Sequence, residues 1–354
     1  MNELIGLAVV LLKAVLVLGA VLNLALFVIW VERKGSALIQ NRIGANRAAI
    51  FGFDFAGLLN TLVADPVKAL TKEDFVPPGS SRFLHALAPF LAVFPVIIAF
   101  AVVPFGPPLR VAGQEIRLQL ADLNAGILFM FAFLSLAVYG TVLAGWVSQN
   151  KFSLLGGLRA SAQMISYEIT MGISIAGVLA AYQSLDLHHI VELQSGTVAG
   201  VLPRWGIFYT PFNWLAFILF FVAVMAETKR APFDLPEAES EIVAGYFTEY
   251  SGIKFLLFWL GEFAEIVVAS AMVTVLFFGG WQVPYVEVAS SALGPLIGAL
   301  VFGLKVAFFC VLQVVVRWSL PRFRYDQLLG LSWKLMLPLA LLNLLATSAY
   351  IVWS

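Results

Sequence analysis

Long apolar segments are the feature that most restricts how this chain can fold. Runs of roughly twenty apolar residues recur along it, and that is the length an α-helix needs to cross the hydrocarbon core of a bilayer. Hydrophobic residues make up 61% of the chain and charged residues only 12%, too few to cover a water-soluble core of this size. The sequence predicts an all-α integral membrane protein in which residues 1–354 form one polytopic domain. Eight segments are expected to cross the membrane: 4–30, 84–104, 124–147, 161–182, 211–227, 253–278, 297–318 and 333–353.

Basic residues are divided unequally between the two sets of connections. Sixteen lie in the connections after the first, third, fifth and seventh spans, whereas Arg110, Arg117 and Arg204 alone lie in the others. Lys and Arg collect on the cytoplasmic side, so we expect both termini outside the cytoplasm and the charged loops inside it. The first span lacks a preceding basic residue and a cleavage pattern, which favours a retained anchor. Because the net charge is zero, nothing favours nucleic acid as a partner.

Two cytoplasmic loops follow from this topology. The loop at 31–83 contains apolar residues with helical spacing from Phe55 to Leu70, which predicts an amphipathic helix at the membrane surface. Pro66 is expected to kink that helix or to begin a second segment. The loop at 228–252 is acidic, and no internal repeat or soluble domain is evident.

The first polar cluster closes the first span. Glu32, Arg33 and Lys34 are followed by Gln40 and Arg42. Basic residues at this position are typical of a simple positive-inside anchor. Glu32 is not needed for an anchor, whereas a site for a polar head group can use mixed charge.

The second cluster is acidic and lies in the stretch ETKRAPFDLPEAESEIVAGYFTEYSG. Such a run is often a solvated surface. Three further carboxylates lie inside predicted spans, where a charge costs at least a few kcal/mol and usually marks an ion or proton path. Burial and mutual repulsion raise carboxyl pKa values, so the group is suited to relaying protons. The loop acids are Glu227, Asp234, Glu237, Glu239, Glu241 and Glu249, and those inside the spans are Glu168, Glu262 and Glu265.

Several kinds of site are excluded by the residues present. Cys310 is the only cysteine, so the chain cannot form an internal disulfide or hold a thiolate-bound iron–sulfur cluster. No glycine-rich dinucleotide fingerprint, P-loop or HExxH motif occurs. We therefore expect no metal, flavin or NADH site in this chain.

Three stretches resemble one known family. ETKRAPFDLPEAESEIVAGYFTEYSGIKF closely resembles the signature loop of the complex I membrane subunit called the H subunit in bacteria and NADH dehydrogenase subunit 1 in mitochondria. VERKGSALIQNRIGANR and AQMISYEI resemble its other two signatures, and the eight-span layout with a long first loop fits throughout. Ala45 departs from the family's usual Gly-Pro-Asn turn, although Gly44 and Asn46 still suit a turn.

The resemblance implies a subunit of proton-translocating NADH:quinone oxidoreductase in a bacterial inner membrane, with quinone as substrate. Its partners would be the peripheral-arm subunits at the quinone site, the small membrane subunits leading to the antiporter-like subunits, and membrane lipid. On this resemblance, the quinone passage is lined or supported by Glu32, Arg33, Lys34, Gln40, Arg42, Asp65, Lys68, Asp234, Glu237, Glu239 and Glu241. The implied proton path comprises Glu168, Glu227, Glu249 and Glu262.

Two alternatives remain open. A related hydrogenase-type membrane anchor would share the fold and the carboxylates, but its signature loop would be less complete. A free-standing secondary transporter would be expected to show paired broken helices or an internal repeat. Co-purification separates these classes, because a transporter should be isolated alone and a complex subunit with many partners.

Overall fold

The computed structural model describes residues 2–49, 55–111, 114–198, 202–285 and 293–353. The helices in these ranges are α1 (Asn2–Ile39), η1 (Phe55–Gly57), η2 (Asn60–Ala64), α2 (Asp65–Thr71), α3 (Arg82–Ala99), η3 (Phe100–Val102), α4 (Gly126–Val147), α5 (Lys151–Tyr182), α6 (Leu187–Leu193), α7 (Gly206–Tyr209), α8 (Asn213–Glu227), α9 (Glu239–Ile242), η4 (Gly245–Phe247), α10 (Gly252–Phe277), α11 (Gly294–Ser319), α12 (Tyr325–Gly330), η6 (Leu331–Met336) and α13 (Leu337–Trp353). Two short antiparallel pairs complete the structure: β1 (Leu109–Val111) with β2 (Gln114–Ile116), and β3 (Thr197–Val198) with β4 (Leu202–Pro203).

The prediction of an all-α, multi-pass membrane protein is confirmed. Within the described residues, seven helices are long and apolar enough to cross a membrane. The predicted span at 211–227 forms as the shorter helix α8, whose 15 residues extend about 22 Å. The eight expected segments are therefore all helical, and one of them is shorter than a typical bilayer crossing.

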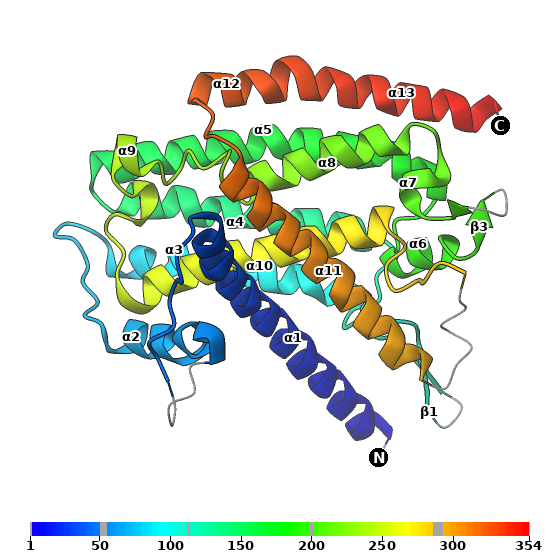
Figure 1. The fold of residues 1–354 in the computed structure, drawn as a ribbon, viewed down its shortest axis with the longest axis horizontal. Coiled ribbons are helices and arrows are strands. Elements are labelled where there is room, and N and C mark those ends of the chain that lie inside the picture. Colours follow the sequence, from blue (N-terminus) through cyan, green and yellow to red (C-terminus); the bar gives the residue numbers. More distant parts are fainter. Residues whose placement is uncertain (1, 50–54, 112–113, 199–201, 286–292, 354) are drawn as a thin grey trace.

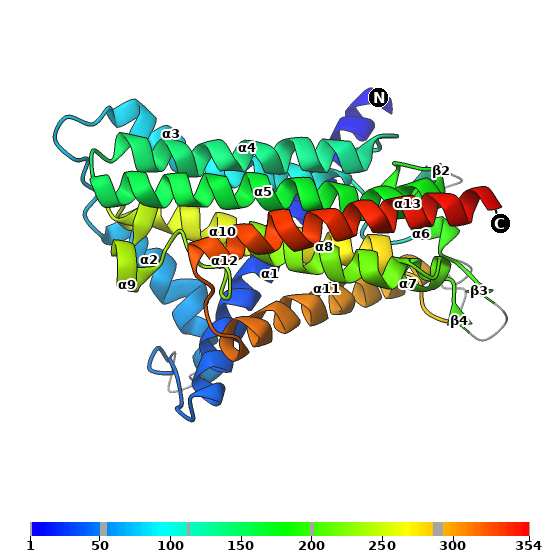
Figure 2. The same cartoon turned by 90° about the horizontal axis from the view of Figure 1, so that it is seen from above.

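The helices share one long axis. Figure 1 shows α4, α5, α8, α10 and α13 running along it, with α1 and α11 crossing obliquely on one side. Figure 2 shows α11 beneath the bundle and α1 crossing it toward the N-terminus at the top, and both views place the two chain ends opposite α2 and α9. The structure thus separates an end with the termini from an end with the polar loops.

Two helices extend beyond the predicted apolar segments. α1 continues past Glu32 to Ile39 and ends where Asn41 adopts a left-handed conformation with φ 53°, as residues after a helix C-terminus commonly do. α5 begins at Lys151 because the Asn150 side chain accepts a hydrogen bond from the Phe152 amide and caps the helix. Charged residues such as Glu32 end the apolar run but do not end the helix. The first part of the 31–83 connection is therefore helical.

The segment from Phe55 to Thr71 is helical, as predicted, with a π-helical stretch in η2. Pro66 lies at the beginning of α2, directly after η2, so the chain changes from π-helix to α-helix next to this proline. Its apolar residues Leu62, Val63, Val67 and Leu70 are exposed in the isolated chain. This surface is suited to contact with lipid or with another subunit.

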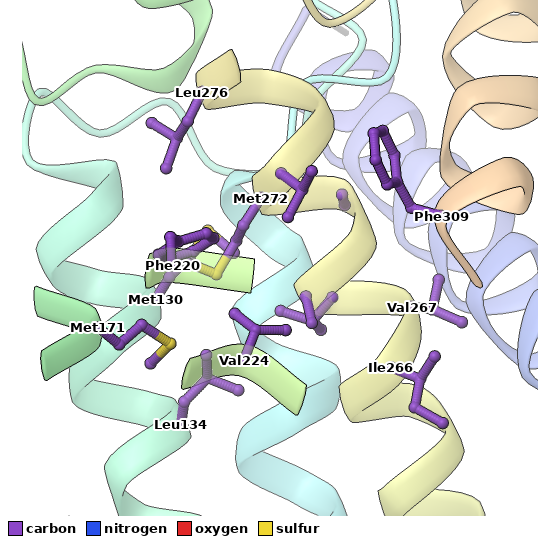
Figure 3. Close-up of a cluster of buried hydrophobic side chains, with 14 of the residues drawn as sticks. Met130, Leu134, Met171, Phe220, Val224, Ile266, Val267, Met272, Leu276 and Phe309 are labelled. Atoms are coloured by element: carbon purple, nitrogen blue, oxygen red, sulfur yellow. The ribbon is translucent and has the colours of Figure 1, made fainter. Parts of the chain in front are cut away.

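α10 is the central helix of the bundle. Every residue from Gly261 to Phe277 is buried, and α10 contacts α1, α3, α8 and α11. Figure 3 shows the apolar layer around it, in which Met130 and Leu134 of α4, Met171 of α5 and Val224 of α8 converge. Charged residues on α10 therefore face protein rather than lipid.

Candidate functional site

Two buried cations follow directly after α8. The Arg230 guanidinium lies 3.3 Å from Glu262 on α10 and 3.6 Å from Glu32 on α1, and its Cζ lies 4.3 Å from the centre of the Phe263 ring. Burial opposes its charge, but Glu32 and Glu262 outweigh burial and raise the pKa of Arg230 above its usual value. Arg230 thus joins two transmembrane helices as a permanent cation.

Glu32 accepts from a second guanidinium. Arg317, near the end of α11, forms an ion pair with Glu32, although the two residues are 285 positions apart in the sequence. The Glu32 side chain is only 13% exposed. The polar-loop ends of α1 and α11 are therefore held together with the segment after α8 by one carboxylate between two arginines.

Two acids of the loop lie beside this pair. Asp234 binds Arg322 at 2.9 Å. Burial raises the pKa of Asp234 to about 6, against the opposing effect of Arg322 and Arg317. Burial and the Glu262 carboxylate raise the pKa of Glu237 to about 8. Near neutral pH these two groups can exchange protons with their surroundings.

Glu262 has a neutral partner besides Arg230. The Tyr246 hydroxyl donates to its Oε1 at 2.7 Å, and both side chains are buried. Burial and then the Glu262 carboxylate raise the pKa of Tyr246 well above its usual value, so the phenol stays protonated. One oxygen of Glu262 therefore faces a hydrogen-bond donor and the other faces a guanidinium.

The row of acids continues to a small enclosed cavity. Its volume is about 20 Å³, enough for one water molecule, and Glu227 of α8 and Glu265 of α10 both line it. The Lys229 Nζ lies 3.5 Å from the Glu265 Oε2, whereas the Glu227 Oε2 has no hydrogen-bond partner in the described structure. Figure 3 shows Leu134 and Met171 among the apolar walls. The cavity is polar on one side and closed by the apolar layer on the other.

The two remaining predicted path residues lie on different sides of this row. Glu168 of α5 accepts from the Ser135 hydroxyl of α4 and repels the Glu227 carboxylate electrostatically. Glu249 instead accepts from the Asn150 amide at 2.8 Å, at the beginning of α5. The geometry brings Glu168 to the row and gives Glu249 a separate partner.

The first cluster is divided in a similar way. Arg33 pairs with Asp65 of α2 at 2.5 Å, and its Cζ lies 5.4 Å from the Trp259 ring centre. The remaining predicted passage residues have local contacts or are exposed. Lys34 donates to the Ile43 carbonyl, Arg42 donates to Gln40, Lys68 is exposed, and Glu241 pairs with Arg159. The side chain of Glu239 lies outside the described residues.

Gln163 of α5 holds the cation-bearing segment in place. Its side-chain amide donates to the carbonyls of Ala226 and Phe233, at 2.7 Å each. The amide is buried, so these bonds are shielded from water. Lys229 and Arg230 therefore lie within a turn fastened at both ends.

Several residues of the cluster were not among the predicted site residues. In the sequence, Lys229, Arg230, Arg317 and Arg322 contribute only to the division of basic residues between the connections, and no pattern singles out Tyr246. The Lys-Arg pair directly between Glu227 and the acidic loop is the one signal that could have identified the first two. Among the described residues, no group of three or more His, Cys, Asp or Glu side chains is placed to hold a metal ion.

Comparison with known proteins gives a consistent result. The sequence model of the NADH dehydrogenase family matches residues 12–348. A Geobacter sulfurreducens protein named as the second H subunit of NADH-quinone oxidoreductase is 46% identical over 95% of this chain and 94% of its own length. The H subunit of Syntrophotalea carbinolica is 45% identical over 100% of this chain and 99% of its own length. The H subunit of Protochlamydia amoebophila is 46% identical over 92% of each chain.

Proposed function

Because the chain belongs to the NADH dehydrogenase family, as a relative of the H subunit of NADH-quinone oxidoreductase, we propose that it forms the quinone chamber and a proton path of that complex. The other subunits of the complex are its partners. Quinone is the substrate of this proposed site, and the reduction of quinone is linked to proton movement.

The quinone passage in this proposal lies where α1, α2 and the acidic loop meet. Arg33 and Asp65 join α1 to α2, and Trp259 provides an aromatic surface next to the guanidinium. A reduced or partly reduced quinone carries negative charge on its oxygens, which nearby guanidinium groups stabilise. Lys34 and Gln40 with Arg42 support the loop that follows α1. Lys68, Glu239 and Glu241 are assigned to the same passage only through the resemblance of the sequence.

The observation that carries the proposal is the unbroken sequence of carboxylates from the acidic loop into the membrane. Glu237 and Asp234 lie beside Glu262, Arg230 links Glu262 to Glu32, and Glu265 reaches the cavity shared with Glu227. Cations interleave with these acids. A change of charge at the quinone therefore shifts the proton affinity of the next group, and that group affects the one after it.

The apolar layer gives this path a direction. Leu134, Met171, Val224 and Met272 are apolar walls of the cavity, and Figure 3 shows the apolar layer continuing along α10 as far as Leu276. Glu168, by contrast, lies near Glu227 between α4 and α5. In our proposal protons pass sideways through Glu168 toward the small membrane subunits and the antiporter-like subunits, and they do not cross the bilayer through this chain.

The orientation belongs to the same proposal. The polar-loop end faces the cytoplasm and the peripheral arm of the complex, and both termini face the other side of a bacterial inner membrane. The uneven division of basic residues supports it, and the structure supplies the matching separation of α2 and α9 from the chain ends.

Glu262 provides the sharpest test. Glu262→Gln keeps the size and the hydrogen bond from Tyr246 but removes the titratable proton, so the complex should assemble while coupled quinone reduction falls. Glu262→Asp should retain more activity than Glu262→Gln. Glu192→Gln, on α6 at the other end of the bundle, is the matched control and should leave the rate unchanged. If Glu262→Gln assembled and pumped at the parental rate, Glu262 would not be part of the path.

A further inference from the structure

A second hollow lies far from the acidic loop, between α1 and α11. It has a volume of about 310 Å³ and is closed on the third side by the segment around Gln119. Its walls are apolar, with Val17 and Leu24 from α1 and Phe302 and Val306 from α11. Figure 2 shows α1 and α11 meeting near their polar-loop ends and diverging from there toward the opposite end of the molecule. The proposed quinone chamber uses none of these groups.

One charged residue lines this groove. Lys13 contributes to its wall, and its Nζ lies 3.5 Å from the Gln119 carbonyl, at the outer limit of a hydrogen bond. No carboxylate among the described residues forms an ion pair with Lys13. An ammonium group next to apolar walls is costly in a membrane unless an anion or the interface satisfies it.

The position of Lys13 along α1 indicates its depth in the bilayer. Glu32 and Arg33 lie near the polar end of the helix, and Lys13 lies nineteen residues before Glu32, or about 28 Å at 1.5 Å per residue. Because α1 runs obliquely, the depth that this length covers is smaller than 28 Å. Lys13 nevertheless lies beside Gln119, in the connection between α3 and α4, and a connection between two spans lies near the bilayer boundary.

The shape and charge of the groove favour one kind of occupant. It follows α1 from Lys13 to Leu24 for about 16 Å, its walls are apolar, and the only charged residue that lines it in the described structure is Lys13, at one end. An acyl chain along the walls with a phosphate at the ammonium group matches both features.

We propose that this groove binds one anionic phospholipid, with an acyl chain between α1 and α11 and the head-group phosphate on Lys13. The lipid covers apolar surface that the described chain leaves open and neutralises the one cation there. It also supports the angle between α1 and α11, whose other ends are joined through Glu32 and Arg317.

The test uses the assembled complex purified in detergent. Two photoactivatable lipids, phosphatidylglycerol and phosphatidylcholine with a diazirine on one acyl chain, are crosslinked and the labelled peptides are identified by mass spectrometry. Peptides of α1 and α11 should be labelled, with phosphatidylglycerol favoured. Lys13→Gln should reduce that preference about fivefold, the ratio expected for one lysine near an anionic head group.

A second variant fills the groove without removing charge. A side chain added at Gly303 meets no atom within 4 Å, so Gly303→Leu extends into the open space and should reduce labelling by both lipids. Gly172→Leu on α5, which also meets nothing within 4 Å, is the matched control and should not change labelling in the groove.

Three results would overturn the proposal. One is unchanged labelling in Gly303→Leu together with an unchanged lipid preference in Lys13→Gln. Another is crosslinking of the groove peptides to a different subunit instead of to lipid. The third is displacement of the lipid by excess inorganic phosphate, which would indicate an anion site at Lys13 without an acyl-chain site.

Discussion

Replacing Arg230 should unbalance the buried cluster more than any other single change. Arg230→Met keeps the contact with Phe263 but leaves Glu262 with only the Tyr246 hydroxyl, whereas Glu32 keeps Arg317. Breaking a buried ion pair by removing one partner costs about 3–5 kcal/mol, because the remaining charge is left uncompensated. That corresponds to a change of roughly a hundredfold to several thousandfold in the ratio of folded to unfolded chain.

The cost should fall when the stranded carboxylate is also neutralised. In the double variant Arg230→Met with Glu262→Gln, no unpaired charge remains at this position, so at least half of the lost stability should return. This recovery is the coupling that a double-mutant cycle measures. Arg324→Met, which removes an exposed guanidinium paired with Asp326, is the control and should change stability by less than about 1 kcal/mol.

The assay combines the yield of assembled complex from membranes with its apparent melting temperature in detergent. The Arg230→Met variant should lose most of the assembled complex, and the double variant should recover it while remaining poor in quinone reduction. Additive losses in the double variant would refute the reasoning, since they would show that Glu262 is not the charge that Arg230 compensates.

Three further expectations concern the passage, the acidic loop and the topology. Arg33→Ala should impair quinone reduction but leave NADH oxidation by a hydrophilic artificial acceptor intact; loss of both activities together with the assembled complex would make Arg33 a structural anchor. Glu237 has a folded-state pKa of about 8, above its unfolded value, so its destabilising effect is absent below about pH 4.5 and complete above pH 8. Apparent stability should therefore rise on acidification from pH 8, by at most about 1.4 kcal/mol per pH unit, and Glu237→Gln should flatten that slope. A cysteine that replaces the exposed Ser195 should react with an impermeant thiol reagent added outside intact cells, and a cysteine that replaces Asp326 should not. Cys310 is buried, so it should add little background. The reverse pattern would invert the proposed orientation.

The two labelling positions are chosen from the part of the chain that the structure describes. The connection near Gly113 belongs to the same set as that of Ser195, but Gly113 lies outside the described residues. In the set of connections proposed to face the cytoplasm, the side chain of Ser240 in the acidic loop also lies outside them. Ser195 and Asp326 therefore test the same orientation from described, exposed positions.

Most of the fold was predictable because membrane spans depend on local composition. Eight apolar runs gave eight helices, and the helical spacing from Phe55 to Leu70 gave the surface helix. The predicted bounds of α1 and α5 were too short, because apolar content shows which residues lie in the membrane and does not show where a helix begins or ends. Backbone geometry at Asn41 and the cap at Asn150 define the helix ends.

The candidate site was only half predictable, for a different reason. Intramembrane carboxylates such as Glu262 are conspicuous in a sequence because each is costly in an apolar setting. The cation that satisfies each of them is fixed by helix packing, as with Arg317 and Glu32 at opposite ends of the chain. Counting charges assigned Arg317 to topology, whereas the structure places it in the buried cluster.

The two hydrogen bonds of Gln163 have a mechanical consequence for the acidic loop. The turn that carries Arg230 is fastened to α5 through Phe233, and Glu241 of α9 pairs with Arg159 of the same helix, so residues 235–240 lie between two points fixed to α5. Displacement of the loop is thus confined to a short flap that contains Glu237. Amide hydrogen exchange would record this as slow exchange on both sides of a fast segment, and a molecule bound next to the flap would slow that segment alone.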